Sequence, residues 1–215
     1  HYHPAPTVTA VTAATGTSLG GTTVVLTGTG FSDNAAGTPS VTFGGSAATS
    51  ITVLDDTSIQ CVTPAGTASS SVAVVVQNQN GTGTLAAGYA YHPLPTVTGV
   101  SPGSGTALGG TAITITGSGF EDNAPGSNSV TFDGNAATSV VVVDDTTITC
   151  VTPAGTAGAT GAVAVENQNG TASLANSFSY FPAPTVTTIS PAIGKWQGGE
   201  AVTISGTGFV ANGAS

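Results

Sequence analysis

The sequence predicts an all-β protein that consists of small β-sandwich domains in tandem. Thr, Val, Ser, Ala and Gly dominate the composition, which suits strands and tight turns, and only 5% of the 215 residues are charged. The sequence repeats itself at an interval of 89 residues, the spacing between Cys61 and Cys150. Within each repeat, short runs of alternating apolar and polar residues are separated by turn residues such as Gly, Asp and Asn.

The repeat sets the expected domain organisation. Pro6, Pro95 and Pro184 open three similar segments, and the first two align without a gap. We therefore expect complete repeats at 6–94 and 95–183, an incomplete third repeat at 184–215, and the end of a preceding repeat or linker at 1–5. The chain is interpreted as a window on a longer array. An alternative is that another chain supplies the missing strands of the third repeat.

Inward-facing apolar residues mark seven expected strands in the first repeat. The opening strand covers Thr7 to Val11, and the others are centred on Val24 and Leu26, Val41 and Phe43, Ile51 and Val53, Ile59 and Cys61, Val74 and Val76, and Tyr89 and Tyr91. Turns are expected at Gly20-Gly21, Gly44-Gly45, Asp55-Asp56 and Asn80-Gly81. Seven short strands at this spacing predict a β-sandwich.

The expected linker between repeats is very short. Strand seven continues through Tyr91-His92-Pro93-Leu94-Pro95 into the first strand of the next repeat, and the two prolines favour an extended, stiff segment. Strands of about 6–8 residues at about 3.3 Å each make a module roughly 35–45 Å long. Such modules in series are expected to form a rod.

The order of four motifs resembles the IPT/TIG domain family. A Gly-Gly-Thr string runs to Gly30-Phe31, a strand with the family's Val-x-Phe-Gly-Gly pattern covers Val41 to Gly45, an Ile-x-Cys-x-x-Pro strand covers Ile59 to Pro64, and an aromatic strand ends at Tyr91. The resemblance covers both complete repeats and the partial third. The first repeat departs from it at Thr12-Ala13, where the other repeats have Ser-Pro, and the third departs at Glu200, where the others have Thr.

The resemblance implies tandem immunoglobulin-like β-sandwiches of about seven strands each, which act as non-enzymatic modules. The family occurs in bacterial surface proteins, in receptors such as plexins, beside some starch-acting enzymes and in certain transcription factors. Simple tandem copies with so little charge look most like a prokaryotic-type surface protein.

Charge excludes two classes of partner. Lys195 is the only basic residue against ten acidic ones, and the formal net charge is −9. Nucleic acids and anionic membrane surfaces are bound through Lys and Arg, so neither is an expected partner. No apolar run approaches the roughly 18 residues of a membrane span, so membrane insertion of this segment is not expected. Near-absence of lysine protects a chain from trypsin-like proteases, which suits a secreted or cell-surface location.

The two cysteines, Cys61 and Cys150, are predicted to be small buried hydrophobes, one in each repeat. Equivalent points of successive modules would lie about 40 Å apart on the strand-length argument, whereas a disulfide needs Cα atoms within about 7 Å. Intermolecular pairing stays open as an alternative.

The acidic residues are predicted to form turns. Adjacent strand residues point to opposite faces, so Asp55-Asp56 and Asp144-Asp145 are poorly arranged for acid–base catalysis. Calcium is the one alternative cofactor, and its oxygen ligands would come from these pairs together with Asp33-Asn34, Glu121-Asp122-Asn123 and Asp133.

No catalytic or cofactor-binding residue is predicted. His1, His3 and His92 lie at expected junctions between repeats and are interpreted as packing residues, because Phe181 replaces His92 at the next junction. The string Gly16-Thr-Ser18-Leu-Gly20 joins two expected strands, whereas a nucleophile elbow joins a strand to a helix.

Asn80 and Asn169 are candidate N-glycosylation sites, because each begins an Asn-Gly-Thr acceptor sequence. The same Asn-Gly dipeptides favour hairpin turns, and the two interpretations are compatible. Exposed Thr and Ser side chains could also carry O-linked sugars.

The leading functional hypothesis is a structural repeat module of an extracellular filament, stalk or cell-surface adhesin. One alternative is a carbohydrate- or protein-binding surface module. Sugar-binding surfaces usually contain exposed aromatic residues, and Trp196 is the only tryptophan in the sequence. Another is a set of spacer domains in a larger secreted enzyme. Uncharged Thr/Val edge strands also predict self-association into fibres or bundles.

Overall fold

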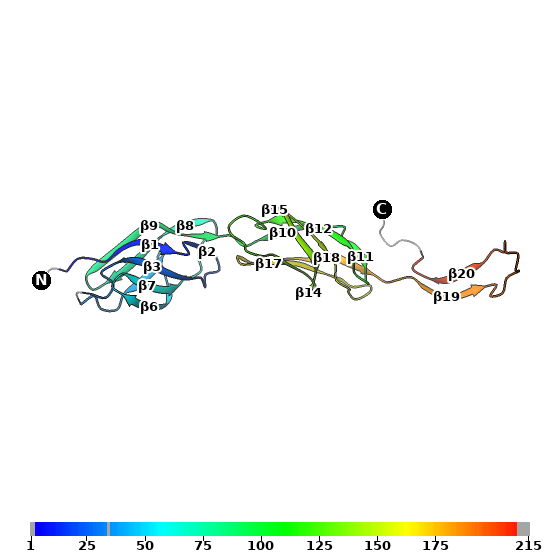
Figure 1. The fold of residues 1–215 in the computed structure, drawn as a ribbon, viewed down its shortest axis with the longest axis horizontal. Coiled ribbons are helices and arrows are strands. Elements are labelled where there is room, and N and C mark those ends of the chain that lie inside the picture. Colours follow the sequence, from blue (N-terminus) through cyan, green and yellow to red (C-terminus); the bar gives the residue numbers. More distant parts are fainter. Residues whose placement is uncertain (1–2, 34, 210–215) are drawn as a thin grey trace. The chain divides into compact units, whose positions relative to one another are not determined.

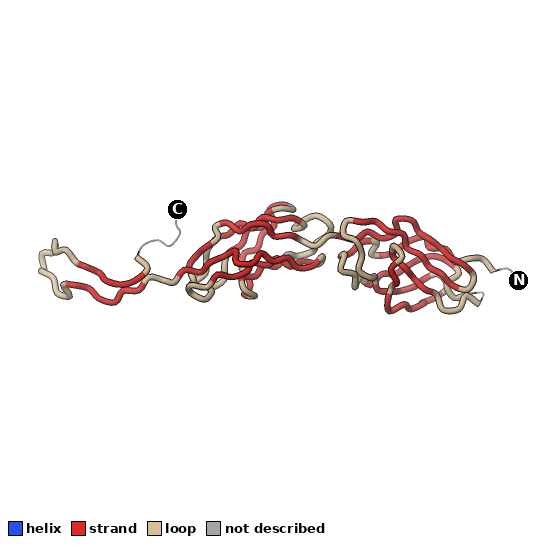
Figure 2. Tube along the Cα trace, turned by 180° about the vertical axis from the view of Figure 1, so that it is seen from behind, coloured by secondary structure: helices blue, strands red, loops and turns tan. Residues whose placement is uncertain are grey.

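The computed structural model describes residues 3–33 and 35–209, and all regular structure in this part of the chain is β-strand (Figure 2). The predicted all-β class is therefore confirmed. No helix that could cross a membrane occurs in the described residues.

Within its described residues the first repeat contains nine strands (Figure 1). They are β1 (Thr7–Thr12), β2 (Thr15–Thr17), β3 (Thr23–Thr29), β4 (Ser40–Phe43), β5 (Ser46–Ala47), β6 (Thr49–Asp55), β7 (Ser58–Val62), β8 (Ser70–Asn78) and β9 (Gly81–His92). They form a four-stranded sheet in the order β1-β3-β7-β6 and a five-stranded sheet in the order β2-β9-β8-β4-β5. The seven predicted strands are all present.

The core lies between these two sheets and follows the alternation seen in the sequence. On β3, Val24 and Leu26 point inward and are buried, while Thr23 and Thr27 face solvent. Phe43 packs edge-to-face on Tyr89, and Tyr89 packs in the same way on Tyr91. The buried side chains of this cluster all lie between residues 8 and 91.

The opening strand divides between the two sheets. β1 pairs antiparallel with β3, whereas β2 pairs in parallel with β9, where Thr15 is opposite Ala90 and Thr17 is opposite His92. Ala13 lies between β1 and β2 and adopts a positive φ of 59°, a conformation that redirects the chain. The sequence predicted one strand here, because three residues are too few to show an alternation.

The hairpin between β8 and β9 turns one residue earlier than predicted. Asn78 pairs with Gly81, so Gln79 and Asn80 are the central residues of the turn. The Asn78 side-chain oxygen accepts the backbone N–H of Asn80 at 2.9 Å, and this local bond favours the turn at that position.

The second repeat has the same architecture. Its strands are β10 (Thr96–Ser101), β11 (Ser104–Thr106), β12 (Ala112–Ser118), β13 (Ser129–Phe132), β14 (Asn135–Ala136), β15 (Thr138–Asp144), β16 (Thr147–Val151), β17 (Thr160–Asn167) and β18 (Gly170–Phe181). The sheets are ordered β10-β12-β16-β15 and β11-β18-β17-β13-β14. The aromatic stack recurs as Phe132, Phe178 and Tyr180, so Phe178 stands where the first repeat has Tyr89.

The segment after the second repeat contains two antiparallel strands, β19 (Thr185–Ser190) and β20 (Thr203–Thr207). The Thr185 and Thr207 hydroxyls lie 2.7 Å apart and reproduce the 2.8 Å pair of Thr7 and Thr29 between β1 and β3. This segment therefore has the local pairing that opens a repeat.

The chain divides into two compact units. The first comprises His1–Thr96, Glu121–Ser127 and Glu166–Ala172, and the second comprises Val97–Phe120, Asn128–Val165 and Ser173–Ser215. The expected repeat boundaries, at 94/95 and 183/184, stay predictions.

Candidate functional site

Asp56 holds the loop that follows β3 through its carboxylate. The Oδ1 atom accepts the backbone N–H groups of Asp33 at 2.8 Å and Ser32 at 3.1 Å, and Oδ2 accepts that of Gly30 at 3.2 Å. These donors stabilise the charged carboxylate and lower its pKa, the Asp33 N–H contributing most. Asp56 lies in the predicted turn between β6 and β7, but its carboxylate binds the distant loop after β3 rather than the backbone of its own turn.

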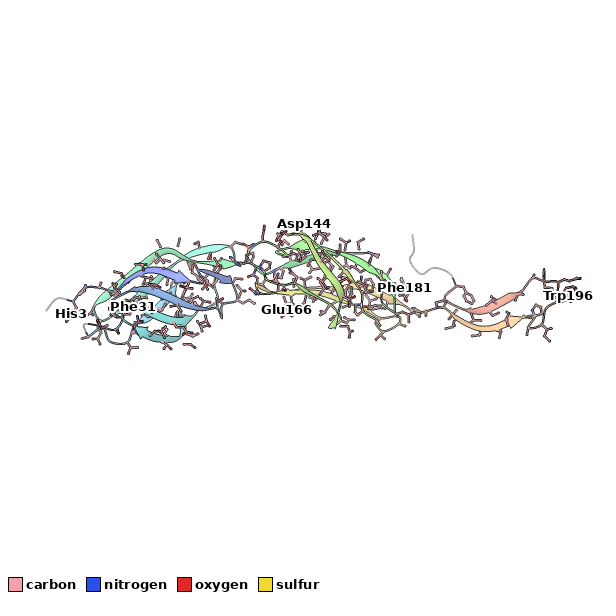
Figure 3. The ribbon with its side chains drawn as sticks, in the orientation of Figure 1. His3, Phe31, Asp144, Glu166, Phe181 and Trp196 are labelled. Atoms are coloured by element: carbon pink, nitrogen blue, oxygen red, sulfur yellow. The ribbon has the colours of Figure 1, made fainter. Side chains whose placement is uncertain are left out.

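The Asp55 carboxylate closes the turn between β6 and β7. It accepts the backbone N–H and the hydroxyl of Thr57, both at 2.7 Å, and the hydroxyl bond is the main cause of its lowered pKa. Asp144 accepts the same two groups from Thr146 at 2.8 Å in the second repeat, and its pKa is lowered for the same reason (Figure 3 labels Asp144). Neither carboxylate is paired with a second acid for catalysis.

Several of the acidic residues offered as calcium ligands bind backbone groups in the structure. Asp133 accepts the backbone N–H of Ala162 at 2.9 Å, and Asp56 binds the three N–H groups described above, while Asn34 lies outside the described residues. Across residues 3–33 and 35–209 no group of three His, Cys, Asp or Glu side chains is close enough to hold a metal ion. Calcium binding therefore rests on the sequence pattern alone.

Both cysteines are buried and carry free thiols, as predicted. Cys61 on β7 and Cys150 on β16 point into the cores of their repeats. Burial raises the pKa of each thiol to about 11, because the thiolate would lose its hydration. They act as small core side chains.

His92 and Ser18, which belongs to the Gly-x-Ser-x-Gly string, are joined by a backbone hydrogen bond. The His92 backbone carbonyl accepts the N–H of Ser18 at 2.9 Å, and the Phe181 carbonyl accepts that of Ala107 at 2.8 Å, so the two repeats share this backbone contact. The loop that holds Ser18 joins β2 to β3, which confirms that it is no nucleophile elbow. His3 is half-buried, and His1 lies outside the described residues.

The two candidate glycosylation sites have different surroundings. Asn80 is half-buried in the turn between β8 and β9. Asn169 is only 4% exposed, and its side-chain amide donates to the backbone carbonyl of Asn123 at 3.0 Å. Modification at both positions stays a prediction.

Trp196 lies in the loop between β19 and β20 and is 92% exposed (Figure 3). The neighbouring backbone N–H of Lys195 donates to the Glu200 carboxylate at 3.0 Å, and the two charged groups are 3.9 Å apart. Glu200, the residue that departs from the other repeats, thus bridges this loop.

The structure also forms a hollow that no sequence motif predicted. Its volume is about 340 Å³, and its lining includes Thr15, Gly16, Thr17, Thr22 and His92, all in the first unit. A Cβ atom on Gly16 would overlap both the buried Tyr89 hydroxyl and the Thr22 Oγ1 atom, so glycine is required at this position.

Two curated relatives match most of this chain. The sequence is 30% identical over 206 residues to Fibrocystin-L of Mus musculus and 29% identical over 204 residues to Fibrocystin-L of Homo sapiens. Each alignment covers 95% of this chain but only 5% of the relative, so the chain spans a small part of the curated relatives it matches.

Solved structures with similar folds include the full extracellular region of Plexin A4, at 22% identity and a TM-score of 0.46, with 89% of this chain and 17% of that chain covered. A tandem from titin has 10% identity and a TM-score of 0.44, with 83% and 66% covered. SGBP-B from a complex xyloglucan utilization locus in Bacteroides uniformis has 23% identity and a TM-score of 0.36, with 83% and 50% covered.

The IPT/TIG domain model matches residues 6–92, 95–180 and 184–215. These three segments take in both sandwiches and the β19–β20 segment. The chain belongs to the IPT/TIG domain family.

Proposed function

We propose that this chain is a structural repeat module of an extracellular filament, stalk or cell-surface adhesin. The observation that carries the proposal is that each repeat closes its own apolar core. The first core uses residues 8–91 and the second uses residues 97–180, so the two share no side chain. A domain that is complete in itself can be added in series without changing its neighbour.

The connection between the two sandwiches also supports a spacer role. β9 ends at His92 and β10 begins at Thr96, so only Pro93, Leu94 and Pro95 lie between them. The two prolines restrict the backbone and limit the number of conformations of this linker.

Stretching single molecules between handles at the two ends tests this proposal. The two complete repeats should unfold in two separate events. Each event should lengthen the chain by about 280 Å, since 89 residues extend to about 320 Å and a folded module spans about 40 Å. A single cooperative event, or extension without a force peak, would contradict independent modules.

Self-association through a sheet edge is a second proposal, and β15 favours it. This strand lies at the edge of its sheet and exposes Val141 and Val143, which are 55% and 58% accessible. An edge strand with exposed apolar side chains is a template for pairing with another chain, and the only charge on β15 is Asp144 at its end. Sedimentation at increasing concentration should therefore show assemblies larger than one chain.

The other roles that the sequence left open have direct tests. If Trp196 is part of a glycan platform, the substitution Trp196→Ala should abolish binding on a glycan array. If the repeats are spacers of a larger secreted enzyme, the complete reading frame should encode a catalytic domain.

A further inference from the structure

We propose that the loop over residues 17–21, which follows β2, is a docking surface for the Asn-Gly turn of a following IPT/TIG repeat. Both partners belong to the first compact unit. The Thr17 hydroxyl donates a hydrogen bond of 2.6 Å to the backbone carbonyl of Asn169. Beside this bond, a Cβ atom on Gly170 would lie 3.3 Å from Leu19 Cδ1, so the leucine side chain packs on the turn.

The surface selects a carbonyl group followed by a glycine. The Thr17 oxygen accepts the backbone N–H of Leu19 at 3.2 Å, and the one hydrogen of the hydroxyl is then left to donate to the Asn169 carbonyl. A Cβ atom on Gly170 would also lie 3.0 Å from Leu94 Cγ, so a larger residue there would have to push this side chain aside. An Asn-Gly turn meets both requirements.

The same turn occurs twice in the chain, and the second copy is the one that meets this surface. Residues 78–82 and 167–171 both read Asn-Gln-Asn-Gly-Thr. In each copy the backbone N–H of the second Asn donates to the side-chain oxygen of the first Asn at 2.9 Å. Asn80 is nevertheless half-buried, whereas Asn169 is only 4% exposed. Because the turns are alike, the extra burial comes from the groups around the second one, and Thr17 is among these groups.

The second repeat carries the same surface at residues 106–110, which read Thr-Ala-Leu-Gly-Gly. The backbone N–H of Leu108 donates to the Thr106 hydroxyl at 3.2 Å, as in the first repeat, and Leu108 is 76% exposed against 60% for Leu19. The third segment reads Lys-Trp-Gln-Gly-Gly at residues 195–199 and lacks both the threonine and the leucine. The second repeat therefore accepts the Asn-Gly turn of a further IPT/TIG repeat, and the third segment does not.

Amide hydrogen exchange on the whole chain, read by NMR, tests the docking. The backbone amides of Asn80 and Asn169 are matched reporters, because each makes the same bond within its own turn. The Asn169 amide should exchange at least about fivefold more slowly than the Asn80 amide. Thr17→Val should speed exchange at Asn169 by about fivefold and leave Asn80 unchanged. Thr106→Val is the control, since it removes the same local bond in the second repeat and should leave both amides unchanged.

A second pair of variants tests the leucine. Leu19→Gln copies the residue of the third segment and should also speed exchange at Asn169, whereas Leu108→Gln should not. Equal exchange of the two amides in the original chain would overturn the proposal. So would an Asn169 amide that ignores both Thr17→Val and Leu19→Gln, or a rise at Asn80 as large as that at Asn169, which would show general loosening of the first repeat.

A longer chain tests the surface of the second repeat. In this chain a further copy of residues 95–183 replaces residues 184–215, so that a complete repeat follows Thr106. The added turn should be protected like the turn at Asn169, and Thr106→Val should now release it. If Thr106→Val leaves the added turn unchanged, the surface does not serve successive repeats and the proposal is wrong.

This inference rests on the proposed role of the repeats as modules in series, but the two can fail separately. The stretching experiment reports whether each repeat unfolds on its own, which depends on the two separate cores. Hydrogen exchange at Asn169 reports the docking of one turn. Two unfolding events without protection at Asn169 would therefore reject the docking surface and leave the structural module standing.

Discussion

The Tyr91 hydroxyl donates a hydrogen bond to the Pro64 carbonyl oxygen across 2.8 Å, while its ring lies against the backbone of Gly66. Tyr180 repeats this bond to the Pro153 carbonyl at 3.1 Å, with Gly155 against its ring. The proline and glycine come from the string Cys-Val-Thr-Pro-Ala-Gly-Thr, which recurs letter for letter. The bond therefore attaches the loop after β7 to the last strand of each sandwich.

Replacing Gly66 by Ala should destabilise the first repeat by about 1–3 kcal/mol, because the added methyl group would overlap the Tyr91 ring. Denaturant unfolding measures this change. Gly103→Ala is the control, since a methyl group there would lie 3.6 Å from its nearest neighbour and should have little effect. Equal effects of the two substitutions would show that the ring contact is unimportant.

Acid should weaken the fold through the turn carboxylates. The pKa of Asp56 is lower in the folded chain than its ordinary value near 3.9. Its contribution is therefore complete above about pH 4 and is lost as the pH falls through the folded pKa. Thermal melts between pH 7 and pH 2 should show this loss, and Asp56→Asn should lower the melting temperature at pH 7.

The difference between Asp56→Asn and the original chain should shrink as the pH falls, because protonation removes the same charge from Asp56. A difference that stays constant down to pH 2 would show that the three N–H bonds do not depend on ionisation.

The two thiols should be inert in the native protein. Burial raises the pKa of Cys61 and Cys150 to about 11, so the reactive thiolate is scarce at pH 8. Iodoacetamide should label neither residue in the folded chain and both in guanidinium chloride, as read by mass spectrometry. Rapid labelling of the folded chain would mean that the cores open readily.

The two acceptor sequences should differ in glycan occupancy in a eukaryotic secretory host. Asn80 should be modified more fully, because the Asn169 amide nitrogen is buried and already donates to Asn123. Mass spectrometry of Asn80→Gln and Asn169→Gln variants measures the two occupancies separately. Full occupancy at Asn169 would contradict the prediction. It would mean that the sugar is attached before the Asn169 amide bonds to Asn123.

A charge on the edge of the second repeat should prevent association. Val143→Lys places an ammonium group on the exposed side of β15 and should reduce the assemblies detected by sedimentation. Thr98→Lys, on the exposed face of β10, is the control. If both variants assemble like the original chain, β15 is not the contact.

The sequence located all the longer strands because their inward positions alternate with outward ones. Val24 with Leu26 and Ile59 with Cys61 are such pairs, and each proved to be buried. β2 and β5 were missed because they have three and two residues and depend on partners distant in sequence or on a tight turn. The turn at Gln79 and Asn80 was displaced because the Asn78 side chain, rather than Gly81, determines where the chain reverses.

The hydrogen bonds of the candidate site were predictable from the sequence only where both partners are close together in the chain. The turn role of Asp55 was predictable, since aspartate often bonds to the backbone amide two residues on, as Asp55 does with Thr57. The bonds of Asp56 to the loop after β3 were not, because their donors are distant in sequence. The Tyr89 hydroxyl was not, because its missing partner depends on how Gly16 and Thr22 approach it from β2 and the following loop. Such an arrangement is visible only when the folded chain brings the three residues together.

The parallel pairing of β2 with β9 determines how a repeat resists tension. The chain enters through β1 and β2 and leaves through β9, and the two paired strands run in the same direction. Pulling the ends apart therefore slides one strand along the other in shear, so that their backbone hydrogen bonds bear the force together rather than opening one after another like a zipper. β11 and β18 pair in parallel in the same way, so in each module this short ladder of backbone hydrogen bonds is the part that bears the load.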